Sequence, residues 1–325
     1  MRTTYVIGLI SKKMKNIIFL IVFVNLTCFA QKKIKGMHLL PLGSFKMKFI
    51  EGKDSAEKTV SVQSFFMSNE ITNKEYREFV NDLRLHPTDS LTRLDIRRAS
   101  YNRFIPNDSL KTKHQHWKTW FTSIKYSELL KNIIDSNVWA NEFSDSKKMQ
   151  EKYLHYFSDK YFDDYPVVGV SYSNAFWFCN WKSKKENEAQ LKKKEQLLSD
   201  YRLPTEAEWA YAAQETVQTS SSETQMPVSV KKGKINNFGL RNMGGNISEW
   251  TNSTPFTAVQ IEYTSDYSAE SVFEVDPNQK IIRGANWKEN KSGQTNRATD
   301  KNFRSNVIGF RIVKTRVYTS GSDEL

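Results

Sequence analysis

Apolar and polar residues alternate along this chain in short blocks, which predicts several short strands joined by a few helices. The run FFMSNE at residues 65–70 is rich in aromatic residues, so we expect a short strand there. Thr72 and Glu75 follow with the spacing of a capping box, and apolar residues then recur at helical intervals. A helix is therefore expected to begin just after Thr72 and to bury one face in the core.

Further elements are predicted on both sides of this helix. Residues 37–47 predict a strand and a turn, and residues 166–170 a short buried strand. Ser171 or Ser173 can cap a helix that carries Cys179 on its apolar face, and its lysine-rich continuation is typical of a solvated amphipathic helix. A second capping box predicts another helix start, at Thr205 and Glu208.

The segment 81–164 is unusually rich in aromatic residues, in runs such as RRASYNRF, HQHWKTWF and YLHYFSDKYF. Because a disordered linker is poor in aromatic residues, we expect this segment to fold onto the domain or onto a partner. After it, no repeat of solenoid length is visible, and the chain is expected to end in a short polar tail at 314–325. The organisation predicted is a single domain, residues 31–325, that contains this insertion.

Residues 1–30 have the features of a secretory signal peptide. A basic stretch precedes the apolar run Ile17 to Val24, which is too short to span a bilayer, and small residues follow it. Translation can start at Met1 or at Met14, and either start predicts an exported protein. Cys28 leaves open whether the chain is acylated there, although the residues before it fit a lipidation signal poorly and favour plain cleavage.

Composition narrows the classes of function. The chain has 38% hydrophobic and 13% aromatic residues, enough for a sizeable core, and a mean hydropathy of -0.62 excludes a membrane protein with many spans. The formal net charge is +12, but the lysines are spread out and mixed with acidic residues, which argues against nucleic-acid binding. Cleavage leaves Cys179 as the only cysteine, so neither a disulfide nor a cysteine pair for redox chemistry is expected.

Five separated blocks give the chain a recognisable order. They are FFMSNEITNKEYREFV, YPVVGVSYSNAFWFCNW, YRLPTEAEWAYAA, NFGLRNMGGNISEW, and a last block that begins IIRGANW and ends GFRIV. In their residues and their order along the chain, these blocks resemble the formylglycine-generating enzyme (sulfatase-modifying factor) superfamily. The resemblance implies an α+β fold of the formylglycine-generating-enzyme type, related to C-type lectins, with short strands, few helices and much irregular loop.

The same resemblance argues against the family's reaction. The enzymes hold two copper-binding cysteines after a strand that corresponds to residues 283–286 (RGAN), and the alignment puts Glu289 and Gln294 at those positions. Carboxylate and amide oxygens are hard ligands that neither stabilise Cu(I) nor exchange thiols. We therefore expect no catalytic residue, no copper and no enzyme activity.

Iron is not expected either. Another branch of the superfamily uses three histidines for iron, whereas the five histidines here are scattered. His114 and His116 can share one face of a strand and hold a metal, but beside two tryptophans a packing role is favoured.

A structural calcium ion is the one cofactor that the resemblance implies. The enzymes bind calcium through an Asn, two backbone carbonyls and a Glu, and the matching positions are Asn242, Gly245, Ile247 and Glu249. Ca²⁺ prefers such oxygen ligands, and glycines let a loop turn its carbonyls inward. The alternative is that Asn242 and Glu249 only hydrogen-bond the loop.

Within the superfamily the chain looks most like the gliding-motility and type IX secretion lipoproteins of Bacteroidetes, through the phrase YLHYFSDKYFDDYPVVGVSYSNAFWFCNW. This likeness implies a non-catalytic scaffold at the periplasmic side of the outer membrane. Its expected partners are envelope or secretion-complex proteins, including copies of itself in a ring, and it would meet the membrane only through partners or a lipid on Cys28.

Two other functions stay open on the sequence. One is a metal-dependent oxidase or a formylglycine-generating-like enzyme with an unrecognised site. The other is a glycan- or peptide-binding module that uses the lectin-like cleft of the fold.

Overall fold

The computed structural model describes residues 34–51, 54–94, 121–194, 199–214, 226–255, 276, 278–289 and 296–316. The fold described below is that of the compact unit that begins at Gly36. The expected signal peptide, Cys28, His114, His116 and Gln294 all lie outside the described residues.

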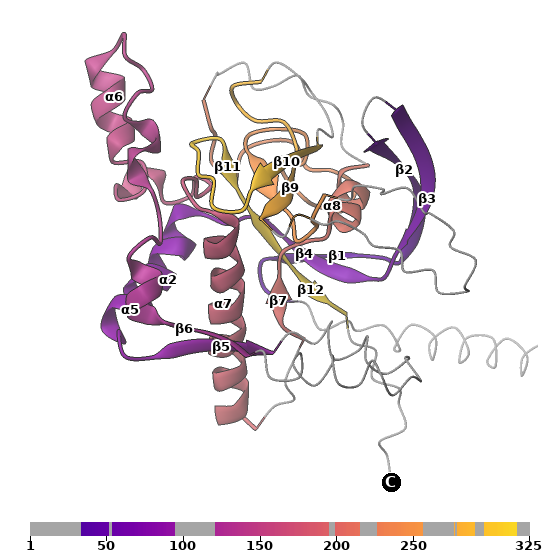
Figure 1. The fold of residues 1–325 in the computed structure, drawn as a ribbon, viewed down its shortest axis with the longest axis horizontal. Helices are drawn as coiled ribbons and strands as arrows, with labels where there is room; N and C mark the ends of the chain where they lie inside the picture. The colour runs from indigo at the N-terminus through magenta and orange to yellow at the C-terminus, as the bar shows by residue number, and fades with distance from the viewer. Residues whose placement is uncertain are drawn as a thin grey trace, which may run out of the picture. The chain divides into compact units, whose positions relative to one another are not determined.

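The first sheet joins the beginning of the domain to its end. Its strands, in order across the sheet, are β1 (Met37–Leu40), β4 (Phe65–Glu70), β12 (Arg311–Thr315) and β7 (Tyr201–Arg202), and Figure 1 shows them side by side. All neighbours are antiparallel, and the register places Arg311 opposite Glu70. Two charged residues from neighbouring strands are thereby brought together.

The second sheet carries the last sequence block. Its order is β10 (Asn296–Asp300), β9 (Gln279–Arg283), β8 (Ser248–Trp250) and β11 (Ile308–Gly309). The β8–β11 pair is parallel, whereas β9 is antiparallel to both β8 and β10. Strand β8 therefore has a partner on each side, and its three residues are buried.

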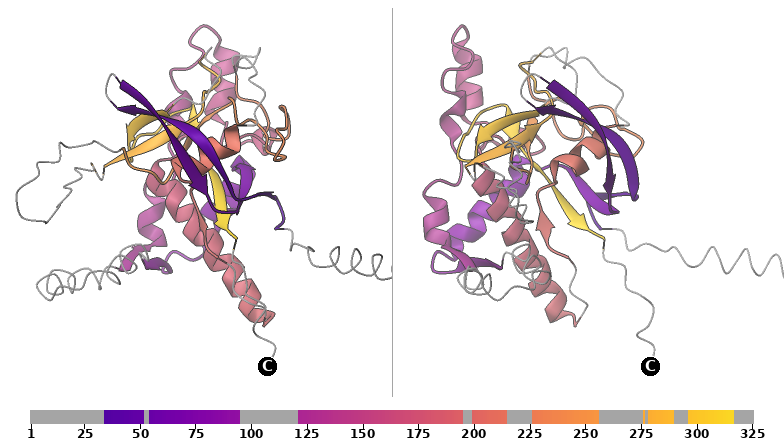
Figure 2. Two further views of the ribbon diagram at one scale, coloured as in Figure 1. Left: turned by 90° about the vertical axis from the view of Figure 1, so that its right-hand side faces the viewer. Right: turned by 45° about the vertical axis from the view of Figure 1, so that its right-hand side comes forward.

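Two hairpins stand outside these sheets, formed by β2 (Gly43–Glu51) with β3 (Asp54–Val62) and by β5 (Ser90–Leu94) with β6 (Phe121–Lys125). Figure 2 shows the long, curved β2–β3 hairpin. Its inward side chains join a core cluster with α8, where the rings of Phe45 and Tyr211 lie 5.7 Å apart.

The three predicted helices are present, with the expected caps. In α2 (Asn73–Leu85) the side chains of Thr72 and Glu75 form a capping box, and Thr205 does the same with Glu208 at α8 (Glu206–Ala213). Helix α7 (Tyr172–Lys192) is capped by Ser171, and Cys179 is fully buried on its inner face. The predictions of these helix starts and of a buried cysteine are confirmed.

The described part of the insertion combines one hairpin with several short helices. It contains β5 and β6, then α5 (Tyr126–Leu130), η2 (Ser136–Trp139), α6 (Lys147–Leu154) and η3 (Lys160–Phe162). Helix α2 continues into its first residues, ends at Leu85 and buries Leu83 in the main core, and the insertion at 81–164 stays a prediction.

Two expectations are corrected. Residues 166–170 are buried as predicted, but they form no strand, and only an isolated bridge joins Pro166 to Thr72. The tail does not begin at residue 314, since Lys314 and Thr315 extend β12 and pair with β4. Lys314 is buried there because its ammonium group is ion-paired with Glu186 of α7.

Three clusters of buried apolar residues fill the domain. The largest packs α2 against α7 and the last strands, and the second lies between the first sheet, the β2–β3 hairpin and α8. The third joins the insertion to Trp287 in the last sequence block. No helix among the described residues is long and apolar enough to cross a bilayer.

Candidate functional site

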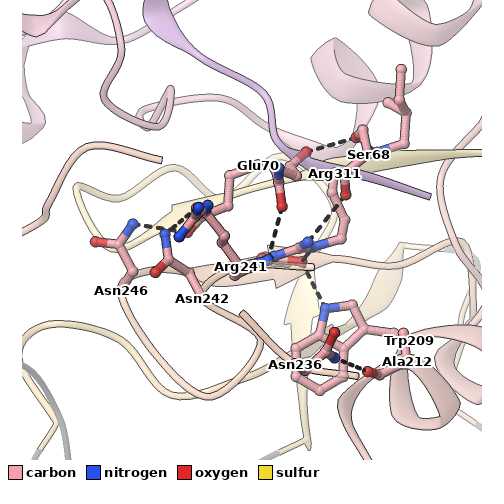
Figure 3. A network of polar contacts seen from close by, with 12 residues as sticks. Ser68, Glu70, Trp209, Ala212, Asn236, Arg241, Asn242, Asn246 and Arg311 are labelled. Atoms are coloured by element: carbon pink, nitrogen blue, oxygen red, sulfur yellow. Dashed lines mark hydrogen bonds and ion pairs between the residues drawn. The ribbon is translucent and has the colours of Figure 1, made fainter. Parts of the chain in front are cut away.

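An ion pair with no solvent exposure lies at the centre of the site. The Glu249 carboxylate accepts hydrogen bonds from Arg311 Nε at 2.6 Å and Nη2 at 2.7 Å, and both side chains are 0% exposed. Trp209 Nε1 donates to the same carboxylate at 2.7 Å, and Arg311 also donates to the carbonyl of Ser68. The pair therefore ties β8, β12, β4 and α8 together, and Figure 3 shows part of this network.

A second carboxylate, that of Glu70, lies beside this pair. Its two oxygens accept hydrogen bonds from Asn242 Nδ2 at 2.7 Å and from Asn246 Nδ2 at 2.8 Å. Burial raises the pKa of Glu70 to about 8, since the attraction of Arg311 and the two amides only partly offsets it. Glu70 is therefore expected to be protonated at neutral pH, so that one guanidinium and one carboxylate form a neutral buried pair.

The loop that supplies these two amides has an uncommon backbone. Asn242 and Asn246 both have positive φ angles, 59° and 69°. Asparagine tolerates this region better than most residues, and the contacts with Glu70 hold both side chains in place. The loop thus presents its amides to the buried carboxylate of the neighbouring strand.

The four residues predicted to bind calcium have clear positions. Glu249 is the partner of Arg311, Asn242 directs its amide to Glu70, and the Gly245 carbonyl accepts a hydrogen bond from the Ile247 amide at 3.0 Å. A guanidinium thus already supplies the positive charge at Glu249. Calcium at Asn242, Gly245, Ile247 and Glu249 stays a prediction, and it requires one oxygen of Glu249 to serve both the ion and Arg311.

The loop after β9 contains the first position at which the resemblance places a catalytic cysteine. Glu289 is ion-paired there with Arg297 of β10. The second nitrogen of Arg297 donates to the Ser248 hydroxyl at 2.7 Å, and Asn286 Nδ2 donates to the same hydroxyl at 3.1 Å. This position holds a neutralised carboxylate in a polar network and has no thiol.

The insertion packs against the beginning of this loop. The ring of Trp139 stacks on Trp287 with 5.7 Å between centroids, and Phe143 stacks on the same tryptophan at 6.4 Å. Between them in the chain, Glu142 is ion-paired with Lys288 and accepts a hydrogen bond from Asn306 at 2.6 Å. Residues 139–143 therefore lie against the residues that immediately precede Glu289.

Metal-binding side chains are not clustered elsewhere in the described part of the chain. No group of three or more His, Cys, Asp or Glu side chains could hold a metal ion among the described residues. The iron alternative rests on His114 and His116, which the described ranges do not include.

Fold and site together define an α+β protein whose small sheets enclose a charged network next to a loop that lacks thiols. The model of the sulfatase-modifying factor enzyme 1-like domain family matches residues 24–225 and 215–316, and the chain belongs to this family. The expected formylglycine-generating-enzyme-like α+β fold is confirmed.

Individual relatives are distant. The chain is 23% identical over 317 residues to a Bos taurus protein named inactive C-alpha-formylglycine-generating enzyme 2, covering 84% of this chain and 85% of that protein. Among solved structures, CarF and, from Pseudomonas aeruginosa, PvdO resemble this chain. Each is 16% identical to it over 86% of its length, with a TM-score of 0.46. The matches cover 98% and 94% of those two chains.

Glu70 and Arg311 are the central residues that the sequence did not single out. Arg311 is a charged residue in the otherwise apolar run GFRIV, and that pattern was the available signal, whereas Glu70 follows two polar residues at the end of FFMSNE and had no such signal. A charged side chain in a buried strand requires a partner, but the sequence does not say which one.

Proposed function

We propose that this protein is a non-catalytic, exported member of the family that acts as a scaffold in an envelope complex of the gliding-motility or type IX secretion type. Its place is the periplasmic side of the outer membrane, and it acts through protein–protein contacts. The expected export rests on the leader-like residues 1–30.

The ion pair between Glu289 and Arg297 is the observation that carries the proposal. A carboxylate held by a guanidinium cannot act as the soft ligand that Cu(I) requires, and it has no thiol to exchange with a substrate cysteine. The printed name of the Bos taurus relative, an inactive enzyme of this type, supports the same reading.

The insertion supports a role in assembly. Its aromatic residues pack on Trp287 and its Glu142 pairs with Lys288, so the chain's own residues occupy the face of the loop that precedes Glu289. An aromatic-rich segment that packs against the start of this loop adds surface for partners.

The activity test uses the purified full chain with Cu(I), oxygen and a cysteine-containing peptide. We expect no aldehyde product, even at enzyme concentrations equal to those of the peptide. Formation of aldehyde by the wild-type chain, lost in Glu289→Ala, would overturn the proposal.

The assembly test shortens the insertion without breaking its hairpin. Leu94 and Phe121 face each other at the end of β5 and β6, so an Asn-Gly turn can replace residues 95–120 and keep the pairing. We expect tagged wild-type protein to co-purify with an envelope complex from its native cells, and the shortened chain to lose at least part of it. A wild-type chain that is monomeric and without a partner would count against the proposal.

A further inference from the structure

An exposed surface of the insertion combines one rigid aromatic side chain with several lysines. Tyr161 in η3 is 59% exposed, and Lys152 of α6 lies over its ring, with Nζ 3.9 Å from the centroid. The loop at residues 230–232 adjoins it, since the Val230 amide donates to the Asp164 carbonyl at 2.8 Å. We call the surface formed by Lys152, Lys160, Tyr161 and Lys232 the Tyr161 surface.

Neighbouring rings hold Tyr161 in place. It stacks on Tyr165 with 6.0 Å between centroids and meets the edge of Phe162 at 5.0 Å. The Tyr161 amide donates to the side chain of Asp159, which caps η3. A tyrosine fixed in this way loses little conformational freedom on binding, which is the property of aromatic residues that anchor interfaces.

The acidic residues near Tyr161 are engaged within the domain. Asp159 caps η3, Asp163 is ion-paired with Arg77, and Asp164 is ion-paired with Lys231 at 2.6 Å.

The lysines of the surface are exposed and not neutralised. Lys152, Lys160 and Lys232 are exposed, and no described carboxylate forms an ion pair with any of them. Glu151, next to Lys152 in α6, projects about 100° around the helix from it. Lys152 and Lys232 thus place positive charge beside Tyr161, and hydrogen bonds from Tyr165 and Lys152, with the charges of these two lysines, lower the pKa of its phenol.

We propose that the Tyr161 surface is a docking site for an acidic segment of a partner protein. This inference rests on the proposed scaffold function and names the chemistry of the partner. Three exposed lysines without an ion pair to a described carboxylate, around a fixed tyrosine, match a run of Asp or Glu residues, and such complementarity speeds association and rejects basic partners.

A membrane surface is a poorer match for the same residues. Interfacial helices bind lipid through a broad apolar face, whereas α6 buries its Tyr153 in the third core cluster. The small exposed aromatic area around Tyr161 suits a protein segment.

The test uses photocrosslinking in the native cells with the full chain. Lys160→p-benzoylphenylalanine places the probe beside Tyr161, and Leu191→p-benzoylphenylalanine, at a 61% exposed position on α7, is the control. In the chain that carries p-benzoylphenylalanine at position 160, the added substitutions Lys152→Glu and Lys232→Glu reverse the charge of the surface. Lys192→Glu with Lys193→Glu makes the same change in net charge at the exposed end of α7.

We expect crosslinks from position 160 to one protein, with the attached peptide rich in Asp and Glu. Their yield should fall about tenfold or more in the Lys152 and Lys232 variant and stay unchanged in the Lys192 and Lys193 variant. Crosslinks to lipid, to a neutral or basic peptide, or with equal yields in both variants would overturn the inference.

The result also separates this inference from the proposed function. If the tagged wild-type protein co-purifies with an envelope complex but position 160 gives no crosslink, the docking surface is wrong and the scaffold function stands. If no partner co-purifies and no position crosslinks, both fail.

Discussion

Replacing Arg311 with methionine should lower the free energy of unfolding by about 3 to 5 kcal/mol, the range for removing one partner of a buried ion pair. Methionine fills a similar volume but leaves the Glu249 carboxylate, which is 0% exposed, with only the indole of Trp209 as a described donor. The carbonyls of Ser68 and Arg241 lose a hydrogen bond as well. The loss is a large part of the roughly 5–15 kcal/mol that stabilises a typical domain.

The assay is urea denaturation of the purified chain at pH 7 in EDTA, followed by tryptophan fluorescence and far-UV circular dichroism. The double variant Arg311→Met with Glu249→Leu should be more stable than Arg311→Met alone, because it leaves no unpaired charge at Glu249. Arg311→Lys keeps the charge but not the two parallel bonds, and it should fall between wild type and Arg311→Met. A loss below about 1 kcal/mol in Arg311→Met, or a double variant less stable than the single one, would refute the reasoning.

Three further predictions test the insertion, pH and calcium. Trp139→Ala should lower the free energy of unfolding by about 3–5 kcal/mol in the same urea titration, because Trp139 is 2% exposed and is surrounded by aromatic rings. The control Leu191→Ala, at an exposed position of α7, should change the free energy of unfolding by less than about 0.5 kcal/mol. Burial tends to raise the pKa of Glu208, but its bonds with Arg202 and Thr205 lower it overall, so its stabilising effect is present above about pH 5 and is lost in acid. Glu208→Gln should therefore melt below wild type at pH 7, with the gap closing towards pH 3, and a gap that is constant with pH contradicts this sign. Calcium bound at its predicted ligands should raise the melting temperature above that measured in EDTA, and Asn242→Ala should abolish this rise. Identical melting curves of the wild-type chain with and without calcium would rule out the predicted site.

Local signals in the sequence predict the helix starts correctly. The capping boxes at Thr72 and Thr205 are both formed, and of the two candidates Ser171, not Ser173, caps α7. Cys179 is buried, as its place on the apolar face of that helix predicts. Each of these features depends on residues within a few positions of one another, so the sequence contains the whole interaction.

The charged network depends on partners far apart in the chain. Glu70 is 172 residues from Asn242, and Arg311 is 62 residues from Glu249. Apolar periodicity predicts that a strand is buried, but it cannot choose which carboxylate meets which guanidinium. The sequence motif therefore offered Glu249 as a metal ligand, while the fold gives it a guanidinium as partner.

The sequence blocks that carry the family resemblance build the buried core, and likeness in those blocks does not decide whether the family's reaction takes place. A side chain at Gly309 would lie 2.3 Å from the carbonyl of Val167, so close packing at that point requires glycine. Trp209 is buried and donates to the buried Glu249, so removing Glu249 leaves the indole N–H without its acceptor, and removing Trp209 takes one donor from the carboxylate. Position 289 is less constrained, since Glu289 is 29% exposed and its partner Arg297 is 37% exposed. Replacing a cysteine with another residue at such a position leaves the buried core unchanged. Likeness in the core residues is therefore evidence for the fold, whereas evidence for activity has to come from the loop itself.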